Sequence, residues 1–412
     1  MRNKVFPGKW ISGLALLGLA SLLFLACGNG AKPGGKGGAD EPQSKADKLA
    51  EAKQLLKQGM QAEKKGEFED AESSYARAHK LRPGHFETAE RYVGVLIKRR
   101  QFEKAIEVAN KFLNRAPDES RRYHLLADAQ IAASEWVPAY ETLTQLIDLD
   151  GANASAYAKR GTVQSMRDDF DKAKEDLGKA LEIEPENADF HAWLGGALLR
   201  ARRINEARVE LNSAIQLDPD NLRAHIFLGK VLREQEDFEG AVAAHEKAVK
   251  LAPDSAEAHF ELGLTQNYAG DNAGAEINMK KATELAPEDA VNWYAYGEVL
   301  RAMGRNNEAA PQYRKALELD PEHPKAANKL GKVLYDAGNF EEAEAVLTER
   351  VRKHPDDSDT YFHLGVTYGK QEKYKLAVEA LEKFLQVAPS GTREIAEAKK
   401  YVRDWKRKVR YR

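Results

Sequence analysis

Small and large apolar residues recur along most of this chain with one fixed period. Proline marks this period, because it returns at even intervals at Pro83, Pro117, Pro185, Pro219, Pro253, Pro287, Pro321, Pro355 and Pro389, with one double interval whose midpoint is Gly151. Laid out in ten rows of one period each, the chain has alanine at one position of every row and glycine at another position of eight rows. A period of about 34 residues predicts an array of repeated supersecondary units.

Three columns define the repeat. The alanines are Ala71, Ala105, Ala139, Ala173, Ala207, Ala241, Ala275, Ala309, Ala343 and Ala377. The glycines are Gly59, Gly161, Gly195, Gly229, Gly263, Gly297, Gly331 and Gly365, with Val93 and Ala127 in the other two rows. Large apolar residues hold a third column at Tyr75, Leu143, Leu177, Leu211, Tyr313, Leu347 and Leu381. Small residues let two helix axes approach closely, and large residues three or four positions away fill the space around the contact.

Each row therefore predicts a pair of antiparallel helices. The proline that closes a row cannot continue a helix and ends the second one. An acid follows this position in seven of ten rows, where it favours the positive end of the next helix. A single hairpin of this kind cannot bury its own apolar face, so the hairpins must stack.

The rows resemble the tetratricopeptide repeat (TPR) over residues 52 to about 391. The row from Leu222 shows the match, with Gly229, Ala241, Ala248 and Pro253 at the family's positions. The resemblance implies an all-α fold: a right-handed α-solenoid superhelix of ten helix hairpins whose first helices line a concave groove. The rows begin at residues 52, 86, 120, 154, 188, 222, 256, 290, 324 and 358.

Three rows depart from the pattern: the third row at several positions, and the eighth and ninth rows within their second helices. The third row has Ala127 for glycine, Pro138 at the start of its second helix and Gly151 for proline. Pro311 is expected within the first turn of its helix, where a missing N–H is tolerated. Arg350 stands where six other rows have alanine, which predicts looser packing there.

The chain begins and ends outside the repeats. Residues 1–26 combine an acid-free cationic start with a short apolar run, typical of a signal peptide. They lead to Cys27 in a segment that resembles the bacterial lipobox, which implies cleavage before Cys27 and acylation of it. An uncleaved anchor or an ordinary secretory signal is the alternative. Residues 27–48 form a Gly-rich tether, 49–391 the ten repeats, and 392–412 a basic amphipathic helix.

The basic segment has an apolar stripe at Ile395, Ala398, Val402, Trp405 and Val409. Its simplest interpretation is a helix that caps the last repeat. Its other side is dense in lysine and arginine, so a patch for anionic lipid or an acidic partner is a compatible second interpretation. Gly28, where an Asp would favour the inner membrane, makes the periplasmic face of the outer membrane the expected location.

Composition and motifs argue against catalysis. The 412 residues hold 63 Lys+Arg and 65 Asp+Glu, a balance that gives no reason to expect nucleic acid as a partner. One cysteine excludes a disulfide framework or a Cys-based zinc site, and the sequence has no Walker loop, HExxH or GxSxG motif. His191, His225 and His259 share one repeat position, too far apart to hold one metal, so we interpret them as packing residues. The acids are interpreted as solvated helix faces. Neither an enzyme, a cofactor, a metal nor a small-molecule substrate is predicted.

The expected function of the chain is to bind proteins in the groove. By the geometry of the resembled family, the groove residues are Trp193, Arg200, Phe227, Lys230, Arg233, Phe260, Tyr268, Tyr294 and Arg301. Aromatic rings beside cations suit a peptide with apolar anchors and acids, although the rings could instead pack between neighbouring first helices.

These features predict a non-enzymatic, membrane-anchored scaffold that binds envelope proteins and helps assemble or position a multiprotein complex of the pilus, secretion or motility type. The alternative is an accessory factor that recruits enzymes of peptidoglycan or polysaccharide synthesis or export.

Overall fold

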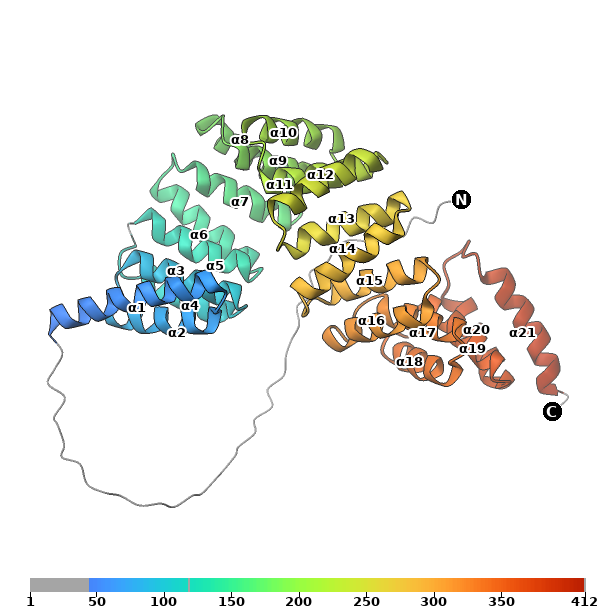
Figure 1. Ribbon diagram of the computed structural model, residues 1–412. Helices are drawn as coiled ribbons and strands as arrows, with labels where there is room; N and C mark the ends of the chain where they lie inside the picture. The colour runs from blue at the N-terminus through green and yellow to red at the C-terminus, as the bar shows by residue number, and fades with distance from the viewer. Residues whose placement is uncertain (1–43, 118, 411–412) are drawn as a thin grey trace, which may run out of the picture. The chain divides into compact units, whose positions relative to one another are not determined.

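The structure is a computed structural model that describes residues 44–117 and 119–410 (Figure 1). Within these residues it contains 21 helices and no strand. Two compact units divide the chain, one up to Leu285 with α1 to α14 and one from Ala286 with α15 to α21. None of the helices in this part of the chain is long and apolar enough to cross a membrane.

The helices form ten hairpins followed by one further helix. In the first unit they are α1 Lys45–Lys65, α2 Phe68–Leu81, α3 Phe86–Lys98, α4 Phe102–Leu113, α5 Ser120–Ala132, α6 Trp136–Leu149, α7 Ala154–Met166, α8 Phe170–Ile183, α9 Ala188–Arg200, α10 Ile204–Leu217, α11 Leu222–Glu234, α12 Phe238–Leu251, α13 Ala256–Ala269 and α14 Asn272–Leu285. In the second they are α15 Ala290–Ala302, α16 Asn306–Leu319, α17 Ala326–Asp336, α18 Phe340–Lys353, α19 Ser358–Lys370, α20 Tyr374–Val387 and α21 Ile395–Arg410.

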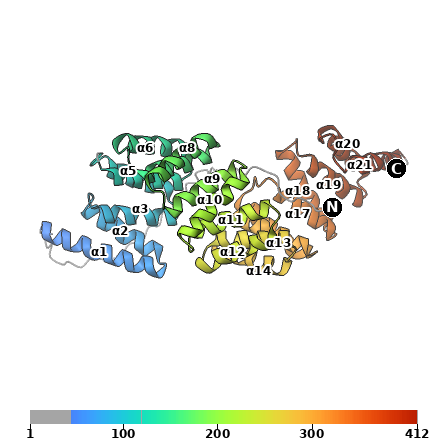
Figure 2. The ribbon, with the colours of Figure 1, turned by 90° about the horizontal axis from the view of Figure 1, so that it is seen from above.

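Within each unit, every helix packs on the next one in sequence, and first helices also pack on first helices, as α7, α9, α11 and α13 do (Figures 1 and 2). This is the stacked-hairpin α-solenoid that the period predicts, so the predicted fold class is confirmed. All ten alanines of the repeat are fully buried, which shows that the small-residue column sits at the contact between paired helices.

The glycine column makes room for the large-residue column of the same hairpin. A Cβ atom on Gly195 would lie 2.6 Å from Cγ of Leu211, and one on Gly229 would overlap the imidazole ring of His245. Only a residue without a side chain lets these helices meet so closely. The glycine thus faces the large-residue column most directly, whereas the column pattern alone placed it against the alanine.

Each hairpin turn contains one residue with left-handed backbone, at the fifteenth position of every row. Four rows have glycine there, and six have a residue with a side chain, which adopts φ from 57° to 62° at a steric cost. The following N–H bonds the carbonyl five residues earlier, as Asp237 does to Leu232 at 2.9 Å, which is the Schellman arrangement that closes a helix. Because glycine is a minority at this position, the turn has only a weak signature in the sequence.

Three details differ from expectation. Helix α1 begins at Lys45 behind a capping box formed by Ser44 and Asp47, so the predicted tether of residues 27–48 overlaps its first turn; residues 1–43, with Cys27, lie outside the described residues. Pro311 is inside α16 rather than in its first turn. Proline has no N–H to donate to the backbone carbonyl four residues earlier. Since Pro311 is exposed, that carbonyl lies on the solvent side of the helix.

The packing of α18 is not loosened at Arg350. Its guanidinium bonds Asp357 at 2.9 Å, and its second terminal nitrogen bonds the carbonyl of Pro324 at 3.2 Å. The arginine side chain is 10% exposed and the aspartate 17%. An ion pair therefore takes the place of the alanine contact.

Helix α21 covers the end of the second unit. Trp405 lies against Gly369, where a Cβ atom would overlap the indole ring. Tyr401 stacks on Trp405 at 4.7 Å between ring centroids, and Ala398 is fully buried. The predicted apolar stripe is thus the packing face of a capping helix as far as Trp405, whereas Val409 at its end is 40% exposed.

Candidate protein-binding site

The candidate site is built on the first helices α9, α11 and α13. Their starts are fixed by side-chain caps from Asn187, Asn221 and Ser255, which accept hydrogen bonds from backbone N–H groups of the first turn. Because these helices pack side by side, residues at equivalent repeat positions form rows across them.

Aromatic rings lie beside cations on α9 and α11. Trp193 is half-buried, and the guanidinium carbon of Arg223 lies 5.3 Å from its ring centroid. Phe227 is also half-buried, with Nζ of Lys230 5.5 Å from its ring centroid. Gly196 makes this possible, since a Cβ atom there would come within 2.5 Å of the Phe227 ring. The indole N–H of Trp193 is buried and has no acceptor among the described residues.

A buried ion cluster joins α11 to α13, and we call it the Glu261 cluster: Lys230, Arg233, Glu261 and Thr265. Lys230 and Arg233 are one turn apart on α11 and reach Glu261 at 3.1 and 2.8 Å. Arg233 also donates to Oγ1 of Thr265 at 2.9 Å. Burial raises the pKa of Glu261, but the two cations outweigh it and lower that pKa to about 2. Both predicted cations are therefore held by a carboxylate of the next repeat.

His245 of α12 lies next to this cluster. Its ring is fully buried, and neither ring nitrogen has a partner among the described residues. Burial lowers the pKa of His245 to about 4, and the nearby Arg233 and Lys230 add to the effect while Glu261 opposes it. The ring is neutral at pH 7 and fills the large-residue position of its row.

The remaining residues predicted for the groove in the first unit are differently placed. Arg200 donates to the carbonyl of Ser165 and to Asp168, each at 3.2 Å. Tyr268 is half-buried and stacks on Phe238, with ring centroids 6.4 Å apart. Phe260 is only 9% exposed, so for this ring the packing interpretation holds.

Tyr294 and Arg301 belong to the second unit, in or beside a second ion cluster that we call the Glu298 cluster: Glu298, Arg301, Tyr313 and Lys329. Arg301 binds both carboxylate oxygens of Glu298 at 3.0 and 3.1 Å, Lys329 lies 3.5 Å from it, and the Tyr313 hydroxyl donates to it. Tyr294 is 4% exposed between Tyr313 and His323, so it is a core residue rather than a groove residue.

The acids at these two places were missed from the sequence. They were interpreted as solvated faces, but Glu261 and Glu298 are buried, each at 7% exposure, so that interpretation is wrong for them. The available signal was the spacing: Lys230 and Arg233 precede Glu261 by nearly one repeat, which brings them onto neighbouring first helices.

The three histidines at one repeat position serve the turns. The Nε2 atoms of His191, His225 and His259 bond the carbonyl of the proline six residues earlier at 3.0, 2.9 and 3.1 Å. In the next row Trp293 makes the same bond to Pro287 at 2.8 Å. These hydrogen bonds give the three side chains a structural role at the turns, in addition to the packing that was predicted for them. The described residues contain no group of three or more His, Cys, Asp or Glu side chains that could hold a metal ion.

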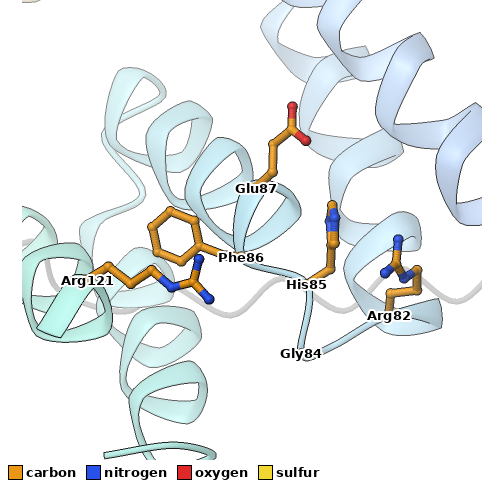
Figure 3. Close-up of a pocket in the computed structure, with 6 residues that line it drawn as sticks. All are labelled: Arg82, Gly84, His85, Phe86, Glu87 and Arg121. Carbon is orange, nitrogen blue, oxygen red and sulfur yellow. The ribbon is translucent and has the colours of Figure 1, made fainter. Parts of the chain in front are cut away.

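A separate pocket of about 570 Å³ lies at the turn between α2 and α3, lined by Arg82, Gly84, His85, Phe86, Glu87 and Arg121 (Figure 3). The guanidinium of Arg121 lies 4.7 Å from the Phe86 ring centroid and also pairs with Glu119 at 3.1 Å. None of the predicted groove residues lines this pocket, and Arg121 is already engaged within the chain.

Stacked helix hairpins with aromatic and cationic residues on the first helices define a class of protein, the helical-repeat solenoids. Comparisons with known families identify the repeat. Residues 276–395 match the TPR domain of cytochrome c-type biogenesis protein H, residues 62–129 and 166–231 match a tetratricopeptide-repeat model, and residues 229–267 match a TPR-repeat model. The chain is a tetratricopeptide-repeat protein, a member of a class that acts in protein–protein interaction.

The chain is also similar to solved structures. The chain is similar to a chain of the APC/C hetero-tetramer Cut9-Hcn1, with 16% identity, a TM-score of 0.53, and coverage of 86% of this chain and 76% of that one. YrrB, a TPR protein with an unusual peptide-binding site, is 24% identical at a TM-score of 0.41, over 46% of this chain and 97% of YrrB. Pseudomonas aeruginosa PilF is 22% identical at 0.45, over 51% of this chain and 96% of PilF. No curated protein matches the chain.

Proposed function

We propose that this chain is a lipid-anchored scaffold of the bacterial cell envelope, which binds extended segments of envelope proteins along α9, α11 and α13 and helps assemble or position a multiprotein complex of pilus, secretion or motility type. One observation carries the proposal: the half-buried rings of Trp193 and Phe227 lie on consecutive first helices, each with a cation against it. Rings supply apolar anchor area, and the exposed Arg223 favours acidic neighbours in a bound segment, whereas Lys230 is already paired with Glu261.

The ion cluster beside the rings supports a preformed surface. Glu261 holds Lys230 and Arg233 in one geometry across two repeats, so little side-chain entropy is lost there when a partner binds. The match of residues 276–395 to a domain named for cytochrome c-type biogenesis supports, at the level of class, a part in assembling other proteins. The apolar segment before Cys27 supports the envelope location.

Site-specific photocrosslinking tests the binding surface. A photoreactive phenylalanine analogue at Phe227 is expected to crosslink to a defined partner in intact cells. The same analogue at Val209, 61% exposed on the second helix α10, is the matched control and is expected to give none. Equal crosslinking from both positions, or none from Phe227, would contradict the proposal. A product containing a wall or polysaccharide enzyme would favour the alternative recruiting role.

Metabolic labelling tests the anchor. Cys27→Ser removes the acylated sulfur, and it is expected to abolish the lipid modification, detected by incorporation of labelled palmitate. Retained label in the variant would show that Cys27 is not the acylated residue, whatever the crosslinking result.

A further inference from the structure

The exposed face of α21 carries a charge pattern that its capping role does not explain. The helix has seven Lys or Arg residues and two acids, a net charge of +5, whereas the whole chain is net −2, which leaves −7 for the rest. A cap needs only a polar outer face. A strongly cationic face on an otherwise acidic protein points to an anionic partner.

The cations are gathered on one side of the helix. At 100° per residue, the side chains Lys399, Lys400, Arg403, Lys406, Arg407 and Arg410 fall within an arc of about 120°, and Glu397 and Asp404 fall outside it. The packing face formed by Ala398 and Trp405 is directed elsewhere, onto α19 and α20. The basic arc runs for about 16 Å along the helix.

Most of these charges are not neutralised within the chain. Lys406 pairs with Glu382 at 2.6 Å and Arg403 lies 3.5 Å from Asp404. Lys399, Lys400, Arg407 and Arg410 are exposed and form no ion pair or hydrogen bond with any described residue. Elsewhere in the same unit, Arg352 pairs with Glu349 at 2.7 Å and Lys332 with Asp336 at 2.8 Å along their helices. Helices α19 and α20 hold only one exposed cation each without an ion pair among the described residues, Lys370 and Lys375.

We propose that this face of α21 docks onto a bilayer containing anionic lipid. The cations form a straight row on a helix rather than lining a pocket, which suits a flat array of headgroups better than a folded segment of an acidic protein. Lysine and arginine stems can lie along such a surface while their charges reach the phosphates. The inference concerns a second contact and does not depend on acylation of Cys27.

Vesicle binding tests it. The chain from Gly28 onward, which holds every described helix, is mixed with vesicles of three parts phosphatidylcholine to one part phosphatidylglycerol, and with phosphatidylcholine alone. Binding is expected only to the anionic vesicles, and it should weaken as salt rises from about 0.1 M to about 0.5 M. Each cation near an anionic surface contributes about fivefold to partitioning. Replacing Lys399, Lys400, Arg407 and Arg410 by Gln is therefore expected to lower the partition coefficient by about 600-fold if the four contributions are independent, and by no less than about tenfold.

The matched control removes the same charge elsewhere. Lys53, Lys57, Lys64 and Lys80 are exposed on α1 and α2, and their replacement by Gln should leave partitioning within about twofold of the parent. Circular dichroism of both variants checks that the helices are retained. Equal loss in the two variants, undiminished binding in the α21 variant, or binding of DNA or polyglutamate without binding of anionic vesicles would overturn the proposal.

Discussion

His245 in the first unit and Tyr313 in the second occupy the same place in their hairpins. Each ring is fully buried and lies over the glycine of its own row, Gly229 or Gly297. Tyr313 donates its hydroxyl to Glu298, whereas both nitrogens of His245 lack a partner among the described residues. The repeat thus demands a large side chain at this position but not a particular chemistry, and the two hairpins differ in whether the polar atoms of that side chain are satisfied.

The two neighbouring carboxylates differ in a related way. Glu261 receives both of its cations from the preceding repeat, so its ion cluster ties one hairpin to the next. Glu298 receives Arg301 from its own helix, Tyr313 from its own hairpin, and Lys329 from the following repeat at 3.5 Å. We infer that the Glu261 cluster mainly holds the stack of repeats together and that the Glu298 cluster mainly closes its own hairpin.

Deleting each carboxylate gives the largest expected effect. Glu261→Ala leaves Lys230 and Arg233, whose side chains are 22% and 16% exposed, without their buried partner, and should cost about 4 kcal/mol of stability. Glu298→Ala does the same to Arg301 and Lys329, which are more exposed at 28% and 27%, and should cost about 3 kcal/mol. Hydrogen exchange resolved by helix measures both, because the two units need not unfold together.

The location of the loss is the sharper part of this prediction. Exchange should rise in both α11 and α13 for Glu261→Ala, but mainly in α15 and α16 for Glu298→Ala. Glu308→Ala, which removes a surface partner of Arg305, serves as the control and should leave exchange in α15 unchanged. The same spread of exchange across neighbouring repeats in both variants would remove the proposed difference between the clusters.

The unsatisfied histidine predicts a pH dependence in the first unit. The folded-state pKa of His245 lies near 4, below its ordinary value of 6.5, so the unfolded chain takes up the proton first. The contribution of neutral His245 to the free energy of unfolding is fully present above pH 6.5 and falls as the pH drops toward 4. Between pH 7 and pH 5 the loss should be about 2 kcal/mol. His245→Leu, which restores the residue of the preceding row, should remove this loss and stabilise the protein by about 1 kcal/mol at pH 7.

Amide hydrogen exchange in α11 to α13 at the two pH values measures this effect. The contributions of the other histidines cancel in the difference between parent and variant, because both proteins contain them. Glu261 does not interfere, since its pKa falls from 4.5 to about 2 and its contribution is lost only as the pH drops below about 4.5. Tyr313→Leu is the matched control: burial and Glu298 raise the pKa of Tyr313, so its removal should not alter the pH dependence. An unchanged loss in His245→Leu would show that the ring is not the titrating group.

The period predicted the fold because the two repeat positions at the closest helix contact hold alanine or glycine in every row, except for Val93 in the second row. Ala207 and Gly195 could be assigned to the helix contact from their columns alone. The candidate site was harder to predict from the sequence. The repeat position that holds Trp193 and Phe227 holds Glu261 in the next row, and the exposure of a side chain at this position depends on the neighbours of each helix. Glu261 looked like any other surface acid until the stacking brought Lys230 and Arg233 within 3.1 Å of it.

Replacing a whole cluster by apolar residues gives the smallest expected change in stability and separates stability from binding. Lys230→Met, Arg233→Met and Glu261→Leu together leave no stranded charge, so stability should stay within about 1 kcal/mol of the parent. The corresponding replacement of Glu298, Arg301 and Lys329 leaves the buried Tyr313 hydroxyl without its acceptor. This should cost about 1 to 3 kcal/mol of stability, which the additional substitution Tyr313→Phe should restore. If the cations of α11 serve the bound segment, the first triple variant folds normally, as its urea unfolding would show, yet loses crosslinking from Phe227. Retained crosslinking would assign Lys230 and Arg233 to the stack of repeats alone, and the rings would then carry recognition without them.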